Sequence, residues 1–170
     1  HPYTKALLAA AKQAQAMRSA APFGIAAVEP VVDFAAVMAH VRRAIAAIAP
    51  HDSQQRFEAL GVTVIRAAAR FTDACTIEAA GTRYTARRIV IATGSSARAL
   101  PGTPFDEVNV LSNDGALRVG AVPKKLALIG SGVIGLEMGS VYSTLGARLD
   151  VVEMTDGLMQ GADRDLVKVW

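Results

Sequence analysis

The chain has 170 residues, of which 52% are hydrophobic and 19% charged, and its formal net charge is +3. This composition is typical of a folded globular protein and argues against a disordered chain. No run of five or more like charges occurs, so nucleic-acid binding has little support. No apolar run approaches the roughly 20 residues needed to span a bilayer, and the first residues show no signal peptide.

Cys75 is the only cysteine, so neither a disulfide framework nor a cysteine-based metal site can be built from this sequence. The histidines His1, His40 and His51 are too widely separated to suggest a ligand cluster, and we expect no metal. A single thiol fits a reducing compartment, which favours a cytoplasmic protein.

Three helices are predicted in the first third of the chain. Apolar residues at helical spacing predict a helix over residues 4–20. A second helix follows Asp33, a suitable N-cap, and extends to about residue 49. A short third helix is predicted over residues 54–60, with Gly61 at its C-terminal end.

Strands are predicted next, beginning with the β-branched segment 62–65. Three short segments separated by turn residues then predict a small antiparallel meander over 69–72, 76–78 and 82–85. The continuous apolar segment Arg88 to Thr93 is typical of a buried parallel strand. A further short strand is predicted over residues 108–111.

The most specific pattern runs from Lys125 to Glu153. It reads as an apolar strand (125–129), the turn Gly-Ser-Gly-Val-Ile-Gly (130–135), a helix, and a second strand (148–152) that ends in Glu153. This order matches the fingerprint of a dinucleotide-binding βαβ unit. The alternative is a glycine-rich turn that serves packing only.

Each glycine of the turn has a mechanical role in that fingerprint. Gly130 permits the tight turn, Gly132 lets a pyrophosphate approach the backbone, and Gly135 lets helix and strand pack closely. Free N–H groups at the helix start, which include those of Val133 and Ile134, favour phosphate binding. Glu153 lies at the spacing where a carboxylate binds the adenosine ribose.

A second candidate site is the turn Thr93-Gly94, directly after the apolar segment 88–93. Ligands in α/β sheets favour the places where strands end. Taken alone, this turn is better explained as a strand end with a glycine.

The whole sequence resembles the flavoprotein, or pyridine nucleotide-, disulfide reductases, and it is most similar to their dihydrolipoamide dehydrogenase branch. Residues 122–170 carry that likeness, above all 141–154 and 162–169. Residues 48–53 and 69–73 are also similar to mercuric reductase-like members. The resemblance implies an internal part of a protein roughly three times as long.

The resemblance implies two cofactors, FAD and NAD. It places Ala69, Thr93 and Gly94 on FAD, and Gly130, Gly132, Gly135 and Glu153 on NAD. Residues 154–157 contain no arginine for a 2′-phosphate, which favours NAD over NADP. The resemblance also puts Lys5 near the flavin and pairs it with Glu137, although both could equally be helix-surface charges.

Several functional parts of the family are not matched by residues 1–170. The first glycine-rich FAD loop and the catalytic base are expected outside this range, and the second redox cysteine aligns with His1. Cys75 cannot replace the cysteine pair, because thiol–disulfide exchange needs two sulfurs within reach. We therefore assign no catalytic residue in this chain and expect it to be inactive alone.

The predicted fold class is α/β, an incomplete FAD/NAD(P)-binding Rossmann-like fold of three layers with a small antiparallel β-meander. The predicted domains are a partial FAD-binding domain over 1–118 and the start of an NAD-binding domain over 119–170. The resemblance implies an oxidoreductase that acts on dihydrolipoamide or a lipoyl-domain dithiol, as a homodimer, with 2-oxo acid dehydrogenase components as possible partners. Alternatives are a mercuric reductase-like or other disulfide reductase, and a non-catalytic dinucleotide-binding module or truncated product.

Overall fold

The structure is a computed structural model that describes residues 2–168. His1, Val169 and Trp170, all of which the resemblance uses, lie outside the described residues. The chain forms two compact units, His1–Ala47 with Ala97–Trp170 and Ile48–Ser96. The first unit joins the two segments because the helix Pro2–Arg18 packs against the helix Val133–Thr144. The domain boundary near residue 118 stays a prediction.

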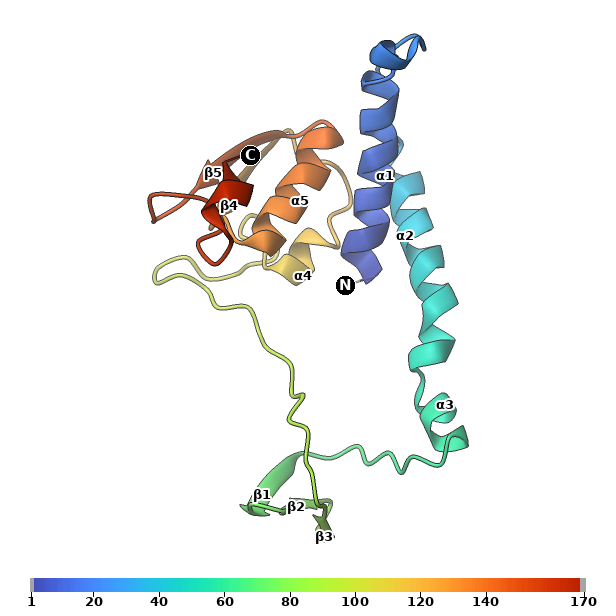
Figure 1. The fold of residues 1–170 in the computed structure, drawn as a ribbon, viewed down its shortest axis with the longest axis vertical. Coiled ribbons are helices and arrows are strands. Elements are labelled where there is room, and N and C mark those ends of the chain that lie inside the picture. The colour runs from blue at the N-terminus through green and yellow to red at the C-terminus, as the bar shows by residue number, and fades with distance from the viewer. Residues whose placement is uncertain (1, 169–170) are drawn as a thin grey trace. The chain divides into compact units, whose positions relative to one another are not determined.

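Helices and one parallel strand pair make up the first unit (Figure 1). Its elements are α1 (Pro2–Arg18), η1 (Ala21–Phe23), α2 (Phe34–Ile48), α4 (Asn113–Ala116), β4 (Lys125–Ile129), α5 (Val133–Thr144), β5 (Arg148–Val152) and α6 (Arg164–Val167). As predicted, Asp33 caps α2: its carboxylate accepts a hydrogen bond from the Ala36 N–H at 3.0 Å.

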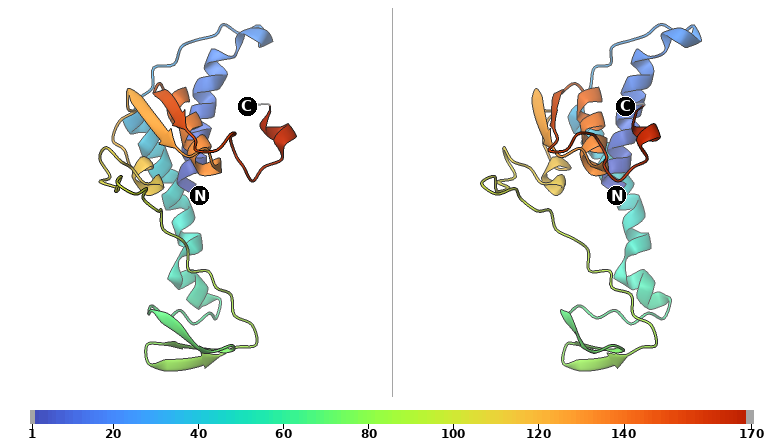
Figure 2. Two further views of the ribbon diagram at one scale, coloured as in Figure 1. Left: turned by 90° about the vertical axis from the view of Figure 1, so that its left-hand side faces the viewer. Right: turned by 60° about the vertical axis from the view of Figure 1, so that its left-hand side comes forward.

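The βαβ unit is confirmed with both strand ranges as predicted. Strands β4 and β5 are parallel and in register from Lys125 opposite Arg148 to Ile129 opposite Val152. Parallel neighbours need a crossover, which α5 supplies. Figure 2 shows the two strands side by side, with α5 along one face of the pair.

The core of this unit lies where α1 meets α5. Alanines line much of the buried side of α1 around Leu7, which is fully buried, so the two helices approach closely. Val141 and Tyr142 of α5 are equally buried, and the Tyr142 hydroxyl donates to the Ala116 carbonyl. Full burial of one such aliphatic side chain stabilises the fold by about 1.5–3 kcal/mol.

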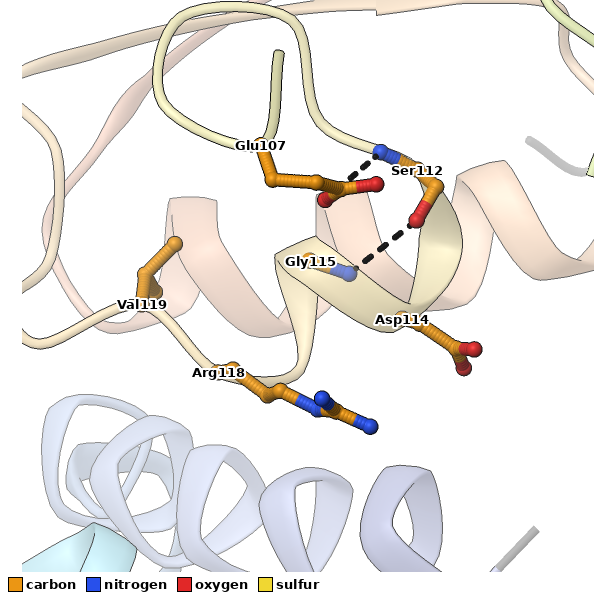
Figure 3. Close-up of a pocket in the computed structure, with 6 residues that line it drawn as sticks. All are labelled: Glu107, Ser112, Asp114, Gly115, Arg118 and Val119. Carbon is orange, nitrogen blue, oxygen red and sulfur yellow. Dashed lines mark hydrogen bonds between the residues drawn. The ribbon is translucent and has the colours of Figure 1, made fainter. Parts of the chain in front are cut away.

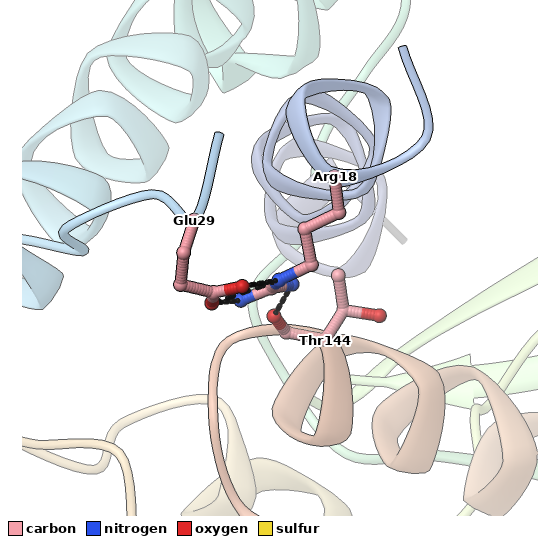
Figure 4. Close-up of polar contacts among 3 residues, drawn as sticks. All are labelled: Arg18, Glu29 and Thr144. Atoms are coloured by element: carbon pink, nitrogen blue, oxygen red, sulfur yellow. Dashed lines mark hydrogen bonds and ion pairs between the residues drawn. The ribbon is translucent and has the colours of Figure 1, made fainter. Parts of the chain in front are cut away.

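An arginine joins the C-terminal ends of α1 and α5 (Figure 4). The Arg18 guanidinium donates to both carboxylate oxygens of Glu29, at 2.6–2.9 Å, and to the Thr144 carbonyl at 2.6 Å. Thr144 ends α5, where carbonyls lack intrahelical partners and a cation is favourable. This contact therefore fixes α5 against α1 at the end opposite the glycine turn.

The second unit contains η2 (Ala49–Asp52), α3 (Gln54–Ala59) and a meander of β1 (Ala69–Asp73), β2 (Thr76–Ala79) and β3 (Thr82–Thr85). The meander is antiparallel, as predicted. Ala80 and Gly81 connect β2 to β3 with φ of 50° and 75°, the pair of positive values that a type I′ hairpin needs.

Three predicted strands are wrong: residues 62–65, 88–93 and 108–111 form no strand. Among residues 2–168, these segments have no neighbouring strand with which to pair, and a strand exists only through such pairing. Val90 and Ile91 are 87% and 71% exposed, the reverse of the expected burial.

The contact between α5 and the strand pair depends on Gly139. A Cβ atom there would lie 2.7 Å from Leu128 Cδ1 and 2.8 Å from Leu149 Cδ2, so one leucine of each strand fills the space over this glycine. We predict that Gly139→Val lowers the free energy of unfolding by about 1–3 kcal/mol through overpacking. Chemical denaturation measures this change.

The matched control is Gly120→Ala, because nothing lies within 4 Å of a Cβ at Gly120 and its φ is not positive. This substitution should change stability by less than about 0.5 kcal/mol. Equal stability of the Gly139→Val protein and the wild type would contradict the packing described here.

Candidate functional site

The glycine turn between β4 and α5 has the backbone geometry that the sequence predicts. Gly130 has φ of +95°, which side chains disfavour, and its N–H donates to the Val152 carbonyl at 2.9 Å. The turn therefore leaves β4 while still hydrogen-bonded to the end of β5. Gly132 follows as the N-cap of α5.

The other two glycines of the turn differ in what surrounds them. A Cβ at Gly135 would lie 2.7 Å from the Gly130 carbonyl oxygen, so the first turn of α5 is pressed against the end of β4. A Cβ at Gly132 would meet nothing within 4 Å, and its φ of −69° suits any residue. The fold thus needs glycine at 135, whereas position 132 faces open space.

That open space lies at the start of α5, a helix of 12 residues. No side chain caps this helix, and Val133 and Ile134 in its first turn are 61% and 60% exposed. Free N–H groups at a helix start carry partial positive charge and bind phosphate oxygens. The residues present therefore fit the pyrophosphate of a dinucleotide, with Gly132 leaving room for its approach.

Glu153 lies directly beside the turn. Its Oε2 atom accepts hydrogen bonds from the Ser131 N–H at 2.8 Å and the Ser131 hydroxyl at 2.6 Å. Its Oε1 atom accepts from the Thr155 N–H and hydroxyl, both at 2.9 Å. The structure thus brings together the turn and the acid that the sequence pattern links across 22 residues.

These four hydrogen bonds favour the charged carboxylate. They lower the pKa of Glu153 to about 2, with the Ser131 hydroxyl the largest cause. Glu153 therefore carries a full negative charge at neutral pH, at the place where a ribose would meet the site.

The loop after Glu153 is held by Arg164. The guanidinium donates to the carbonyl oxygens of Leu158, at 3.1 Å, Met159 and Ala162. The Met159 N–H in turn donates to the Ser131 carbonyl at 3.1 Å. The loop is thereby fastened to the glycine turn, and the nearest downstream arginine is engaged with backbone oxygens.

The flavin-side pair of Lys5 and Glu137 stays a prediction. Lys5 lies exposed on α1 and Glu137 is half-buried on α5, and no ion pair joins them in the part of the chain described. Ala69, Thr93 and Gly94 belong to the other compact unit and are all exposed. Gly94 has φ of +74°, so it makes a glycine-dependent turn. The role of these residues at FAD stays a prediction.

Ser131, Thr155 and Arg164 were missed as site residues by sequence reasoning. Two local patterns could have pointed to Ser131 and Thr155, whereas no sequence pattern singles out Arg164. A hydroxyl inside the glycine turn can reach a nearby carboxylate, and a Thr two residues after an acid commonly donates to that acid's side chain.

A separate pocket of about 430 Å³ lies beside α4 and is lined by Glu107, Ser112, Asp114, Gly115, Arg118 and Val119 (Figure 3). Glu107 accepts from the Ser112 N–H at 3.3 Å, and the Ser112 hydroxyl caps α4 by accepting from the Gly115 N–H at 3.2 Å. Two of the polar side chains therefore hold the local backbone. None of the predicted site residues lines this pocket.

Two further searches cover residues 2–168. In that range no helix is long and apolar enough to cross a membrane. No group of three or more His, Cys, Asp or Glu side chains within it could hold a metal ion.

Comparison with known proteins places this fold and turn in a family. The family model described as pyridine nucleotide-disulphide oxidoreductase matches residues 1–169. The chain therefore belongs to this family of flavoprotein oxidoreductases, and the predicted fold class is confirmed.

Among the relatives is dihydrolipoyl dehydrogenase of Haemophilus influenzae, which is 36% identical over 172 residues. That match covers 98% of this chain but only 36% of the relative. Dihydrolipoyl dehydrogenase of Cupriavidus necator is 48% identical over 92 residues, which is 54% of this chain and 19% of that protein. The chain thus spans about a third or less of the length of these enzymes.

Solved structures agree on the fold. LpdA from Mycobacterium tuberculosis is similar with a TM-score of 0.78 and 25% identity, over 98% of this chain and 38% of that one. The flavoprotein disulfide reductase RclA from Escherichia coli has a TM-score of 0.71 at 20% identity, over 99% and 35% of the two chains, which supports the fold alone.

The low pKa of Glu153 has a consequence for stability in acid. A carboxyl whose pKa is lower in the folded than in the unfolded chain stabilises the fold above its unfolded pKa, about 4.3, and that contribution is lost as the pH falls towards 2. We predict that Glu153→Gln removes this contribution. Its unfolding free energy should fall less than that of the wild type between pH 5 and pH 2.

Denaturation at a series of pH values measures this difference. The control is Asp150→Asn on β5, whose exposed carboxylate lies 3.9 Å from Arg148, since such surface pairs contribute little. If the Glu153→Gln and wild-type curves fall in parallel through this window, the hydrogen bonds to Glu153 do not stabilise the fold.

Proposed function

We propose that residues 119–170 form the NAD half-site of a dihydrolipoyl dehydrogenase-type enzyme. The observation that carries this proposal is the joining of Glu153 to Ser131 beside the open N-terminus of α5. The helix start would hold the pyrophosphate, and Glu153 would accept hydrogen bonds from the adenosine ribose.

NAD is favoured over NADP by the charge at the ribose end. Glu153 is anionic and would repel a 2′-phosphate, and residues 154–157 contain no arginine. Arg164 is engaged with three loop carbonyls. Its release would cost the loop these hydrogen bonds.

In the full-length parent, the proposed reaction is dihydrolipoamide with NAD⁺ to lipoamide, NADH and a proton. FAD, when bound, would supply the electron transfer between dithiol and nicotinamide. The residues described here bind and orient the nucleotide. Ala69, Thr93, Gly94 and Lys5 are proposed to contact FAD in that parent, as part of a predicted domain over residues 1–118.

The proposed partners of the parent are a second copy of itself and the lipoyl-domain dithiol of 2-oxo acid dehydrogenase complexes. The support is the match to enzymes named dihydrolipoyl dehydrogenase. A cytoplasmic location also stays a prediction. The rival disulfide reductases would use the same nucleotide site with another substrate.

Substitution of Gly132 tests the nucleotide site directly. The position has open space around it, so Gly132→Val should cost the fold no more than about 1 kcal/mol, as a poorer N-cap residue. The added side chain would occupy the space where the pyrophosphate approaches. We predict at least a roughly tenfold loss of NADH affinity, about 1.4 kcal/mol, by fluorescence titration.

The control measurement is the free energy of unfolding of the same variant, which separates loss of binding from loss of fold. Unchanged NADH affinity in Gly132→Val would remove the basis for the site. Loss of affinity together with loss of the folded state would contradict the open space described around Gly132.

Residues 1–170 contain only one thiol, so we predict that the chain alone does not reduce NAD⁺ with dihydrolipoamide and added FAD. Absorbance at the NADH wavelength follows the reaction. Measurable turnover would contradict this prediction.

In a parallel titration, NADH binding without flavin uptake would favour the binding-module alternative, and tight flavin uptake would favour a surviving enzyme core.

A further inference from the structure

We propose that the two carboxylate oxygens of Glu153 have different roles: Ser131 fixes Oε2 in place, whereas Thr155 releases Oε1 to a ribose hydroxyl of the bound nucleotide. This inference rests on the proposed nucleotide site and deepens it. It makes Ser131 a positioning residue and Thr155 a replaceable partner, two roles that the glycine fingerprint does not contain.

The starting point is that Glu153 has no acceptor position to spare. A carboxylate offers about four lone-pair positions, two on each oxygen. Ser131 supplies two donors to Oε2 and Thr155 supplies two to Oε1. A ribose hydroxyl can therefore donate to Glu153 only if one of these donors leaves.

The two hydrogen bonds from Ser131 to Oε2 remain in place when the nucleotide binds. Ser131 is 2% exposed, and its N–H belongs to the turn whose backbone also bonds Met159. Its hydroxyl bonds Oε2 at 2.6 Å, and no second acceptor for it is found among the hydrogen bonds of residues 2–168. Displacing this hydroxyl would leave a buried polar group unsatisfied, which is costly.

The hydrogen bond from the Thr155 hydroxyl to Oε1 is the one that can be exchanged. Thr155 is exposed, and its hydroxyl has a second acceptor, the Gly157 carbonyl, at 3.3 Å. A hydroxyl has one proton, so it donates either to Glu153 or to Gly157. Rotation about one bond transfers the donation and frees a position on Oε1, while the Thr155 N–H keeps its own bond.

The surrounding loop tolerates this rotation. Gln160 Nε2 donates at 2.9 Å both to the Thr155 hydroxyl oxygen and to the Gly157 carbonyl. Either orientation of the Thr155 proton keeps a partner for the amide. The ribose hydroxyl can thus replace the Thr155 hydroxyl at Oε1 with no buried group left unpaired.

The test is an NADH and NADPH titration of the full chain carrying Ser131→Ala, Thr155→Val or neither, followed by nucleotide fluorescence. Ser131→Ala removes the hydroxyl donor and keeps the N–H donor, so Oε2 is held by one hydrogen bond in place of two and NADH affinity should fall roughly five- to tenfold. Thr155→Val removes a competitor for Oε1, and NADH affinity should rise roughly two- to threefold. Thr155→Ser, which keeps the hydroxyl, should restore the wild-type value.

NADPH and a double variant separate positioning from a general structural effect. The 2′-phosphate of NADPH replaces the ribose hydroxyl that would donate to Glu153, so NADPH gains nothing from a fixed carboxylate. Ser131→Ala should therefore change NADPH affinity by less than roughly twofold. In a Glu153→Ala background, Ser131→Ala should have no further effect. The control Ser140→Ala removes a hydroxyl on α5 that bonds the Leu136 carbonyl, and it should leave both affinities unchanged.

The outcomes are distinguishable. No NADH binding by the wild type would overturn the proposed function and this inference together. Binding by the wild type with an unaffected Ser131→Ala variant, or with equal losses for NADH and NADPH, would overturn only the role of Ser131. A Thr155→Val variant that loses affinity would show that Thr155 is a fixed support, and the proposed exchange would be wrong.

Discussion

The hydrogen bonds from Ser131 to Glu153 connect the turn after β4 to the residue after β5. The N–H and hydroxyl of one residue reach the same carboxylate oxygen, at 2.8 and 2.6 Å. Hydrogen bonds to a charged group are among the stronger ones in proteins. They set the separation between the open helix start and the acid, which in the proposed site a dinucleotide would span from pyrophosphate to ribose. The rest of the candidate site is arranged around this contact.

Two glycines of α5 let the helix pack closely enough to reach that contact. Gly135 lets the first turn of α5 approach the Gly130 carbonyl, and Gly139 makes room for Leu128 and Leu149 one turn further on. At the far end, Arg18 holds the last carbonyl of α5. Helix α5 is therefore held in position at its start, middle and end. Its free N–H groups accordingly have a fixed position and direction.

The sequence predicts the βαβ unit well because its determinants are local. Each of β4 and β5 is a short run between turn residues, and each finds its neighbour in the other. The segment 88–93 has an equally strong strand pattern but no partner strand among residues 2–168, so propensity alone does not make it a strand. The prediction that Val90 and Ile91 are buried was wrong for the same reason.

The candidate site was predictable in outline and not in detail. The glycine spacing and Glu153 indicate the βαβ turn and its acid, because both follow from backbone geometry. The Lys5–Glu137 pair came from resemblance to a family and from no local pattern, and no ion pair joins the two side chains in the described part of the chain. The bonds from Thr155 and Arg164 depend on the path of one irregular loop, which no periodic pattern encodes.

The most direct measurement is a titration of the isotope-labelled chain with NADH, followed through its backbone amide resonances. If the helix start and the acid form one nucleotide site, the amides of residues 131–135 and of Thr155 shift together and saturate at one concentration. Shifts confined to other parts of the chain, or shifts at the helix start that saturate separately from that of Thr155, would contradict a single site built on the contact between Ser131 and Glu153.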